Sequence, residues 1–257
     1  MADGVRVVSR AVVASAVVAL AVAAARARGL HIERELLVAA GRALLQLGAV
    51  ALVVTAVFDQ LGLSALFLLV MLAAASASAA GRWGNVARAR ARALAAIGAG
   101  AGTVLAVVFA SGAFELQPRF LIPLAGIVIG GSMTATALAG RRLGEEVGDH
   151  VGTIEARLAL GISARQALAP HISRAAVTAL IPAIDQTKNV GLVTLPGAFV
   201  GMLLGGASPI EAAQVQLTVL FLLLGAESIA AIVATHLVAN ALIAPGERIE
   251  LETQPPL

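Results

Sequence analysis

The sequence predicts an all-α, polytopic integral membrane protein with about seven transmembrane helices. Hydrophobic residues make up 59% of the 257-residue chain, charged residues make up only 13%, and the apolar residues gather in long runs. Soluble domains carry about 25% charged residues, and a membrane-spanning helix needs roughly 20 apolar residues. The spans must be helical, because an open strand edge would leave backbone groups unsatisfied in lipid.

Short charged segments separate the candidate spans, and we interpret the whole chain, 1–257, as a single membrane domain. The longest break is the segment 141–189, which is too long to be only a connector. The seven predicted spans are about 9–25, 36–58, 61–80, 93–112, 120–140, 190–206 and 213–238.

The distribution of Lys and Arg predicts the orientation. With the N-terminus outside and the C-terminus in the cytoplasm, 14 of the 18 basic residues lie in inside segments and three lie outside. This is the asymmetry of the positive-inside rule, and it places 141–189 in the cytoplasm. The alternative, a cleaved signal peptide after Arg6 and Arg10, would put the 14 basic residues outside and is disfavoured.

Two helix starts are readable from capping residues. Ser208-Pro209-Ile210-Glu211 has the pattern of a capping box at the last span, whose apolar pattern runs to about Ala244. Ser163 to Gln166 repeats the box after Gly161, which predicts a helix–bend–helix in the cytoplasmic segment. The apolar run 175–184 either lies along the membrane surface or begins a span that breaks near Pro182.

Composition excludes several functional classes. The chain has no cysteine, and its only lysine, Lys188, precedes Asn189, so there is no thiol chemistry and no Walker A loop. The four histidines show no His-x-x-His or His-Glu-x-x-His spacing, and the sequence assigns no metal ligand. The net charge of +3 reflects arginines that flank spans, so we expect no nucleic-acid partner.

Polar residues within or beside the spans are candidates for a transport path. Glu227 lies deep in the last span, and Gln216, three turns earlier, shares its face. This carboxyl could take up a cation or a proton, or it could be a protonated or Arg-paired group that locks two helices. Asp185 and Lys188 could form a gate or an ordinary ion pair.

Three further features have a simpler interpretation. Arg42 and Gln46 lie one turn apart in the second span, where Arg42 could hold a substrate anion, although snorkelling to the cytoplasmic face is favoured. Trp83, which follows the third span, is expected to anchor the chain at the membrane–water interface. Glycines four residues apart predict close helix packing, either static or sliding, and they are Gly98 with Gly102, Gly126 with Gly130, and the series Gly197, Gly201 and Gly205.

The cytoplasmic bend resembles a known element. Glu155-Ala156, followed by Gly161, is similar to the Glu-Ala-Ala…Gly signature of ABC-transporter permeases, in which a short helix fits a groove on a separate ATPase. A more specific resemblance covers roughly 33–240 and points to the FetB-like permeases, a family of iron-export ABC permeases related to plant aluminium-tolerance permeases. Its motifs are 181–197 followed by Gly201, Gly205, Ser208-Pro209, Ala212 and Gln216, and earlier Gly41-Arg42 with Gln46 and 122–126 with Gly130 and Met133.

The resemblance implies a permease subunit in the cytoplasmic (inner) membrane. It implies a homodimer that exports a metal ion such as iron, or a related small solute, driven by a separate ABC-type ATPase. The partner would bind ATP and Mg, and this chain would hold no cofactor and catalyse no reaction. An ion-coupled secondary transporter using Glu227 is the alternative.

The residues and the resemblance together suggest three groups of site residues. The ATPase-coupling group is Glu155, Ala156, Gly161, Ser163 and Gln166. The group that lines the path or gate is Gln46, Asp185, Lys188, Gln216 and Glu227. The helix-packing group is Gly126, Gly130, Pro196, Gly197, Gly201 and Gly205.

Overall fold

The computed structural model describes residues 2–249, and the side chains of 12–53 and 60–249 within them. The chain divides into two compact units, one ending at Asp59 and one beginning at Gln60. The first unit contains α1 (Ala2–Ala27) and α2 (Glu33–Asp59), which pack against each other. Gly29, with φ of +63°, lies in the short connection between them.

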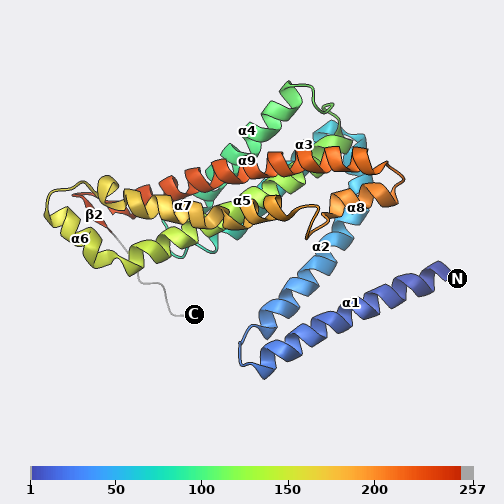
Figure 1. Cartoon of the computed structure of the whole chain (residues 1–257), viewed down its shortest axis with the longest axis horizontal. Coiled ribbons are helices and arrows are strands. Elements are labelled where there is room, and N and C mark those ends of the chain that lie inside the picture. Colours follow the sequence, from blue (N-terminus) through green and yellow to red (C-terminus); the bar gives the residue numbers. More distant parts are fainter. Residues whose placement is uncertain (1, 250–257) are drawn as a thin grey trace. The chain divides into compact units, whose positions relative to one another are not determined.

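The second unit holds the remaining helices, and α5 is central to their packing. α5 contacts α3, α4, α7 and α9, while α7 also packs along α9. α5 runs toward α6, α7 returns from it, and α9 runs toward that end again (Figure 1). The elements are α3 (Leu61–Ala80), α4 (Ala89–Ala110), α5 (Pro118–Asp149), α6 (Val151–Ala159), α7 (Ala164–Asn189), α8 (Gly197–Leu204), α9 (Pro209–Leu242), β1 (Ile243–Ala244) and β2 (Arg248–Ile249).

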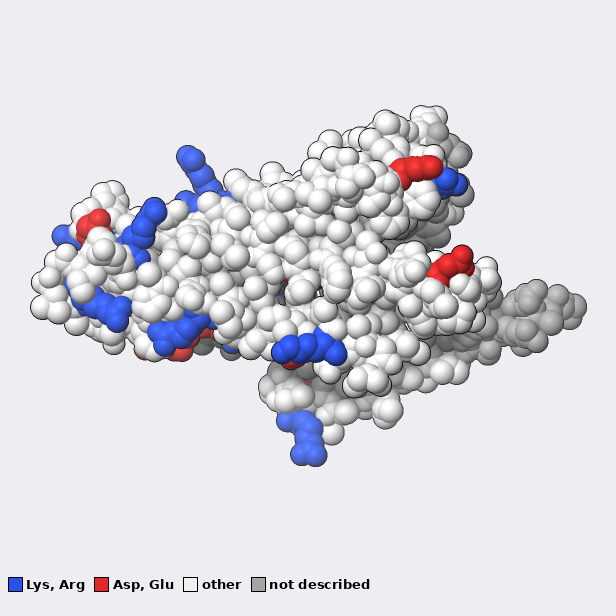
Figure 2. Space-filling view, turned by 45° about the horizontal axis from the view of Figure 1, so that its top comes forward, with Lys and Arg blue, Asp and Glu red and all other residues white. Residues whose placement is uncertain are grey.

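The helical, membrane-spanning class is confirmed. Among the described residues, six helices are long and apolar enough to cross a bilayer, and α1 contributes a shorter apolar stretch, Val12–Ala27. Large apolar side chains such as Leu44 and Leu52 are 75% and 83% exposed. Figure 2 shows a broad surface without charge and several Lys and Arg side chains gathered over the end that carries α6.

The prediction of a span at 190–206 was wrong. Residues 190–196 form a non-helical loop, and α8 has only eight residues, or about 12 Å at 1.5 Å per residue. The crossing helix is instead α7, which continues through Pro170 and Pro182 to Asn189. Residues 175–184 therefore belong to a span that is unbroken at Pro182, and the cytoplasmic break predicted at 141–189 shortens to the region around α6.

Close helix packing occurs one or two residues away from the predicted glycines. A Cβ added at Gly98, Gly102, Gly130, Gly197 or Gly201 would meet no atom within 4 Å, and at Gly205 it would meet only backbone of α8 itself. The close approaches are at Gly100, which lies against Ala226 and Ala230 of α9, and at Gly131, which lies against Leu223 and Glu227. A Cβ added at Gly126 would lie 3.3 Å from Met71 Cε, the end of a flexible side chain of α3, so no backbone of the described residues approaches closely at this glycine.

Trp83 is a core residue and does not anchor the chain at the membrane interface. It lies in the connection between α3 and α4 with only 3% of its surface exposed. Its Nε1 donates a hydrogen bond to the Thr136 carbonyl oxygen at 3.2 Å, and its ring covers Gly140. The indole therefore joins this connection to the middle of α5, because the absence of a side chain at Gly140 leaves room for the ring.

Candidate functional site

The predicted helix–bend–helix is present, and we call residues 151–166 the elbow. α6 ends in a Schellman motif in which Ile162 N donates to the Arg157 carbonyl and Gly161 N to the Leu158 carbonyl. Gly161 has φ of +81°, a left-handed conformation that other residues rarely adopt. The Ser163 hydroxyl then accepts from Gln166 N at 3.4 Å and caps α7.

The side chains at the elbow are available to a partner. Glu155, Ala156 and Gln166 are exposed, so another protein can reach their side chains. Leu160, next to the bend, is 81% exposed. The sequence analysis missed Leu160, because an apolar residue in a membrane protein carries no signal until its position at a tip is known.

A C-terminal hairpin braces the elbow. β1 and β2 pair antiparallel with Ile243 opposite Ile249, and the turn brings the Glu247 carboxylate to accept from Ala164 N at the start of α7. A carboxylate is favourable at this position because the first N–H groups of a helix have no partner within it. The hairpin and α6 also enclose a cleft of about 440 Å³ that Glu155 helps to line.

Glu227 is buried in the membrane-spanning part of α9. Only 8% of its surface is exposed, and its side chain lies against Gly131 of α5. Among the described residues, no Arg or Lys lies within ion-pair distance of it. Glu227 is therefore not paired with an arginine among these residues. Its carboxyl can take up a cation or a proton.

Gly131 gives the Glu227 carboxyl its space. A methyl group at Gly131 would collide with the Leu223 and Glu227 side-chain ends, whereas one at Gly130 would meet nothing within 4 Å. We expect Gly131→Ala to displace the carboxyl and to lower the melting temperature of the detergent-solubilised protein modestly, because flexible side chains can move. Gly130→Ala is the matched control and should not lower the melting temperature. Equal melting temperatures for the two variants would contradict this prediction.

The loop between α7 and α8 covers a second polar residue of α9. Gln216 is buried, and its Oε1 has no hydrogen-bond partner among the residues that the structure describes. It lines a cavity of about 370 Å³ together with apolar residues of the loop, α8 and α9, including Val190, Leu195, Pro196 and Phe199. Since a buried unpaired oxygen is costly, this cavity is a place where a polar solute or water would be stabilised.

The other residues of the predicted path are exposed, and among the described residues the structure assigns their side chains no partner within their own units. Asp185 and Lys188 are both exposed near the end of α7, and the ion pairs of the described residues include none between them. Gln46 and Arg42 are exposed on α2, in the first unit. Their roles stay predictions.

A cluster of Glu146, His150 and His171 was also missed. Glu146 and His150 are one turn apart at the end of α5, and His171 is in the second turn of α7. The four-residue spacing of the first two was a weak signal. His171 lies near Glu146 and His150 only because the chain reverses direction at the elbow. The sequence pattern alone does not predict how closely the two helices then approach.

These features define the class of protein: an all-α, multi-pass membrane protein with a polar elbow at one end of the helices and a buried carboxyl between them. A family model described as "Uncharacterised protein family (UPF0014)" matches residues 8–243, and the chain belongs to this family.

Three relatives show what the chain is similar to. It is 40% identical over 88% of its length to the "UPF0014 membrane protein STAR2" of Oryza sativa subsp. japonica, covering 80% of that protein. It is 35% identical to "Protein ALUMINUM SENSITIVE 3" of Arabidopsis thaliana, over 86% of this chain and 82% of the relative. It is also 35% identical to the "Probable iron export permease protein FetB" of Escherichia coli (strain K12), over 81% of each. No solved structure matches the chain.

Proposed function

We propose that this chain is the membrane permease subunit of an ABC transporter, driven by a separate ATPase that docks on the elbow. The observation that carries the proposal is the exposed Leu160 at a fixed bend, beside the exposed Glu155. An apolar side chain on a rigid tip suits insertion into a groove of another protein, because burial of such a side chain contributes about 1.5–3 kcal/mol. The Schellman motif and the Glu247 contact stiffen the tip, so that a push from the partner would move α7.

The charge distribution supports a cytoplasmic elbow. Basic residues favour the cytoplasmic side of a membrane protein, and the end of the second unit that carries the elbow is rich in them. They are Arg141, Arg142, Arg157, Arg165, Arg174 and Arg248. This orientation would give the ATPase access to the elbow and agrees with a location in the cytoplasmic membrane.

The relatives guide the proposal for cargo and assembly. The printed name of the E. coli relative describes a probable iron export permease, and we extend this to export of a metal ion such as iron, or of a related small solute. We further propose a homodimer of this chain with two ATPase subunits that bind ATP and Mg. The exposed glycine face of α8, containing Gly197 and Gly201, would be free to meet the second copy.

Substitutions of two exposed side chains at the elbow test the proposal. We expect Glu155→Lys, and separately Leu160→Asp, to reduce ATPase co-purification with the tagged permease at least tenfold, while insertion in the membrane is unchanged. Glu115→Lys is the matched control, because Glu115 is exposed in the connection that precedes α5, at the other end of that helix. Full ATPase recovery with both elbow variants would rule out docking at this position.

The second candidate function is an ion-coupled secondary transporter, and the buried Glu227 favours it. An intramembrane carboxyl is a common device for coupling transport to protons or cations. The two candidates differ in their energy source. Uptake or efflux by proteoliposomes that contain this chain alone, driven by an imposed ion gradient, would support the second candidate, while strict dependence on the ATPase and ATP would support the first.

A further inference from the structure

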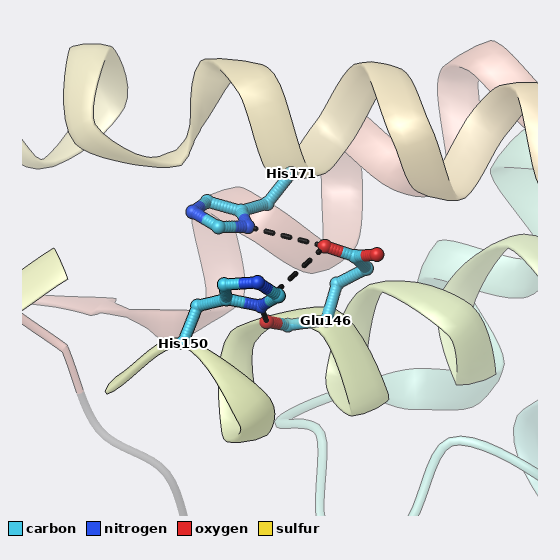
Figure 3. Close-up of side chains that lie close together, drawn as sticks. All are labelled: Glu146, His150 and His171. Carbon is cyan, nitrogen blue, oxygen red and sulfur yellow. Dashed lines mark hydrogen bonds and ion pairs between the residues drawn. The ribbon is translucent and has the colours of Figure 1, made fainter. Parts of the chain in front are cut away.

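We propose that Glu146, His150 and His171 form a binding site for one first-row divalent transition-metal ion, such as Zn²⁺ or Fe²⁺, at the base of the elbow. One ligand atom from each residue lies within 4.8 Å of the others (Figure 3). The Glu146 carboxylate oxygen is 3.2 Å from His171 Nδ1 and 3.7 Å from His150 Nδ1. The proposal concerns binding by the isolated chain and does not depend on the ATPase or on the cargo.

The spacing suits an ion of this size. Two ligand atoms about 2.0–2.1 Å from a tetrahedral metal ion are separated by roughly 3.4 Å. The 3.2 Å separation of the Glu146 oxygen and His171 Nδ1 is close to this value, and all three ligand atoms lie within 4.8 Å of one another. Two imidazoles with one carboxylate favour zinc, iron and their neighbours over calcium or magnesium, which prefer oxygen ligands alone.

The tautomer of His150 is set for metal binding. Its Nδ1 lies 2.9 Å from the Glu146 backbone carbonyl, which can only accept a hydrogen bond, so Nδ1 carries the hydrogen. In the neutral ring the lone pair is then on Nε2, so the His150 ligand atom would be Nε2 and not the Nδ1 that lies 3.7 Å from the Glu146 carboxylate. A histidine ligand that donates its other N–H to a backbone carbonyl is the usual arrangement at metal sites, because that hydrogen bond fixes the ring orientation.

His171 has a nitrogen with two incompatible neighbours. Its Nδ1 is 3.2 Å from the Glu146 carboxylate, which accepts, and 3.2 Å from an Arg174 guanidinium nitrogen, which donates. One ring nitrogen can donate or accept but cannot do both at once. His171 is also 2% exposed, so water has little access to it. A metal ion would resolve this conflict by taking the lone pair of the nitrogen and the charge of the carboxylate together.

Arg174 lies beside two of the atoms that would bind the metal ion, the Glu146 carboxylate oxygen and His171 Nδ1. Its Nε lies 3.4 Å from the same Glu146 oxygen, and its side chain is 53% exposed and free to turn outward. Neighbouring Glu145 is held by Arg141 and Arg142 at 2.8 and 2.7 Å, so it does not compete for the site. Arg174 and the metal ion are therefore expected to compete for Glu146.

A bound ion would connect the two arms of the elbow. Glu146 and His150 precede α6, whereas His171 follows the bend, and the whole elbow lies between them in sequence. The rings of His150 and His171 are already 4.9 Å apart between centroids. Binding would restrain the end of α5 against the start of α7 and limit how far the elbow can move.

Zinc titration of the full chain in detergent tests the site. We expect wild type to bind one Zn²⁺ and to gain thermal stability from it, and we expect His150→Ala and His171→Ala to weaken binding at least tenfold. His236→Ala is the matched control, because His236 is an exposed histidine of α9 outside the cluster. Glu146→Gln, a conservative change, should weaken binding similarly and covers the case in which an alanine variant fails to fold.

Arg174→Gln distinguishes a metal site from a network of ion pairs. Arg174 is partly exposed, so its ion pair with Glu146 is weak. Its removal should therefore tighten Zn²⁺ binding about two- to fivefold. The proposal is overturned if wild type shows no stoichiometric binding, if the cluster variants bind as tightly as wild type, or if Arg174→Gln weakens binding.

Discussion

Gly100→Ala is expected to lower the thermal stability of the protein strongly, even though alanine is the better helix former. An added methyl group would collide with the Ala226 carbonyl oxygen and lie 2.9 Å from the Ala230 Cβ. Both belong to the buried face of α9, and a backbone oxygen cannot rotate away as a side chain can. α4 and α9 must therefore separate, and overpacking of this kind costs about 1–3 kcal/mol.

Gly102→Ala is the matched control for Gly100→Ala. It lies two residues along the same helix, where an added methyl group meets nothing within 4 Å, so only the gain in helix propensity of about 0.5–1 kcal/mol remains. The two variants should shift the melting temperature in opposite directions, measured on the detergent-solubilised protein. Equal shifts would mean that α4 and α9 do not approach closely at Gly100.

Glu227→Gln is expected to have the largest effect on transport of any conservative substitution. Glutamine keeps the size of the side chain, so the packing against Gly131 is retained, but it cannot take up a proton or offer a negative charge to a cation. The loss should be at least tenfold, since about 1.4 kcal/mol of lost interaction changes an equilibrium constant by that factor. For the metal cargo proposed above, the metal content of loaded cells, or growth under metal stress, provides the measurement.

Glu115→Gln, which removes an exposed carboxylate, is the control for Glu227→Gln and should leave transport intact. The Glu227→Gln protein should also elute and melt as wild type does. Normal transport by this variant would assign Glu227 a purely structural role between α5 and α9. Loss of transport together with unfolding would be resolved by Gly131→Ala, which moves the carboxyl without removing it.

Local signals in the sequence predicted local structure well. Ser208 and Glu211 form the capping box as expected, and Ser163 caps α7 directly after the bend at Gly161. These interactions lie within a few residues of each other, so composition and spacing determine them. The predicted end of the last helix was also close to the observed one, because α9 ends at Leu242 and the apolar pattern of the sequence runs to about Ala244.

Features that depend on packing could not be read in the same way. The run 190–206 is more apolar than α7, yet Gly191 and Pro196 break it, while α7 remains helical through Pro182 because α5 and α9 support it. Glycine spacing likewise did not identify the closest approaches between helices within the chain. Gly100 and Gly131 lie between or beside the regularly spaced glycines, and the rotation of each helix toward its neighbour determines which glycine is needed.

The contact between Glu247 and Ala164 has a practical consequence for deletion and tagging studies. Removing the chain after Leu242 would strip the first turn of α7 of an acceptor and uncover one side of α6, although the deleted residues are more than 75 positions downstream of the bend. A fluorescent reporter should accordingly be fused beyond Ile249. Otherwise the truncated protein would have an altered elbow, and the change would be attributed to residues near the bend instead of to the missing hairpin.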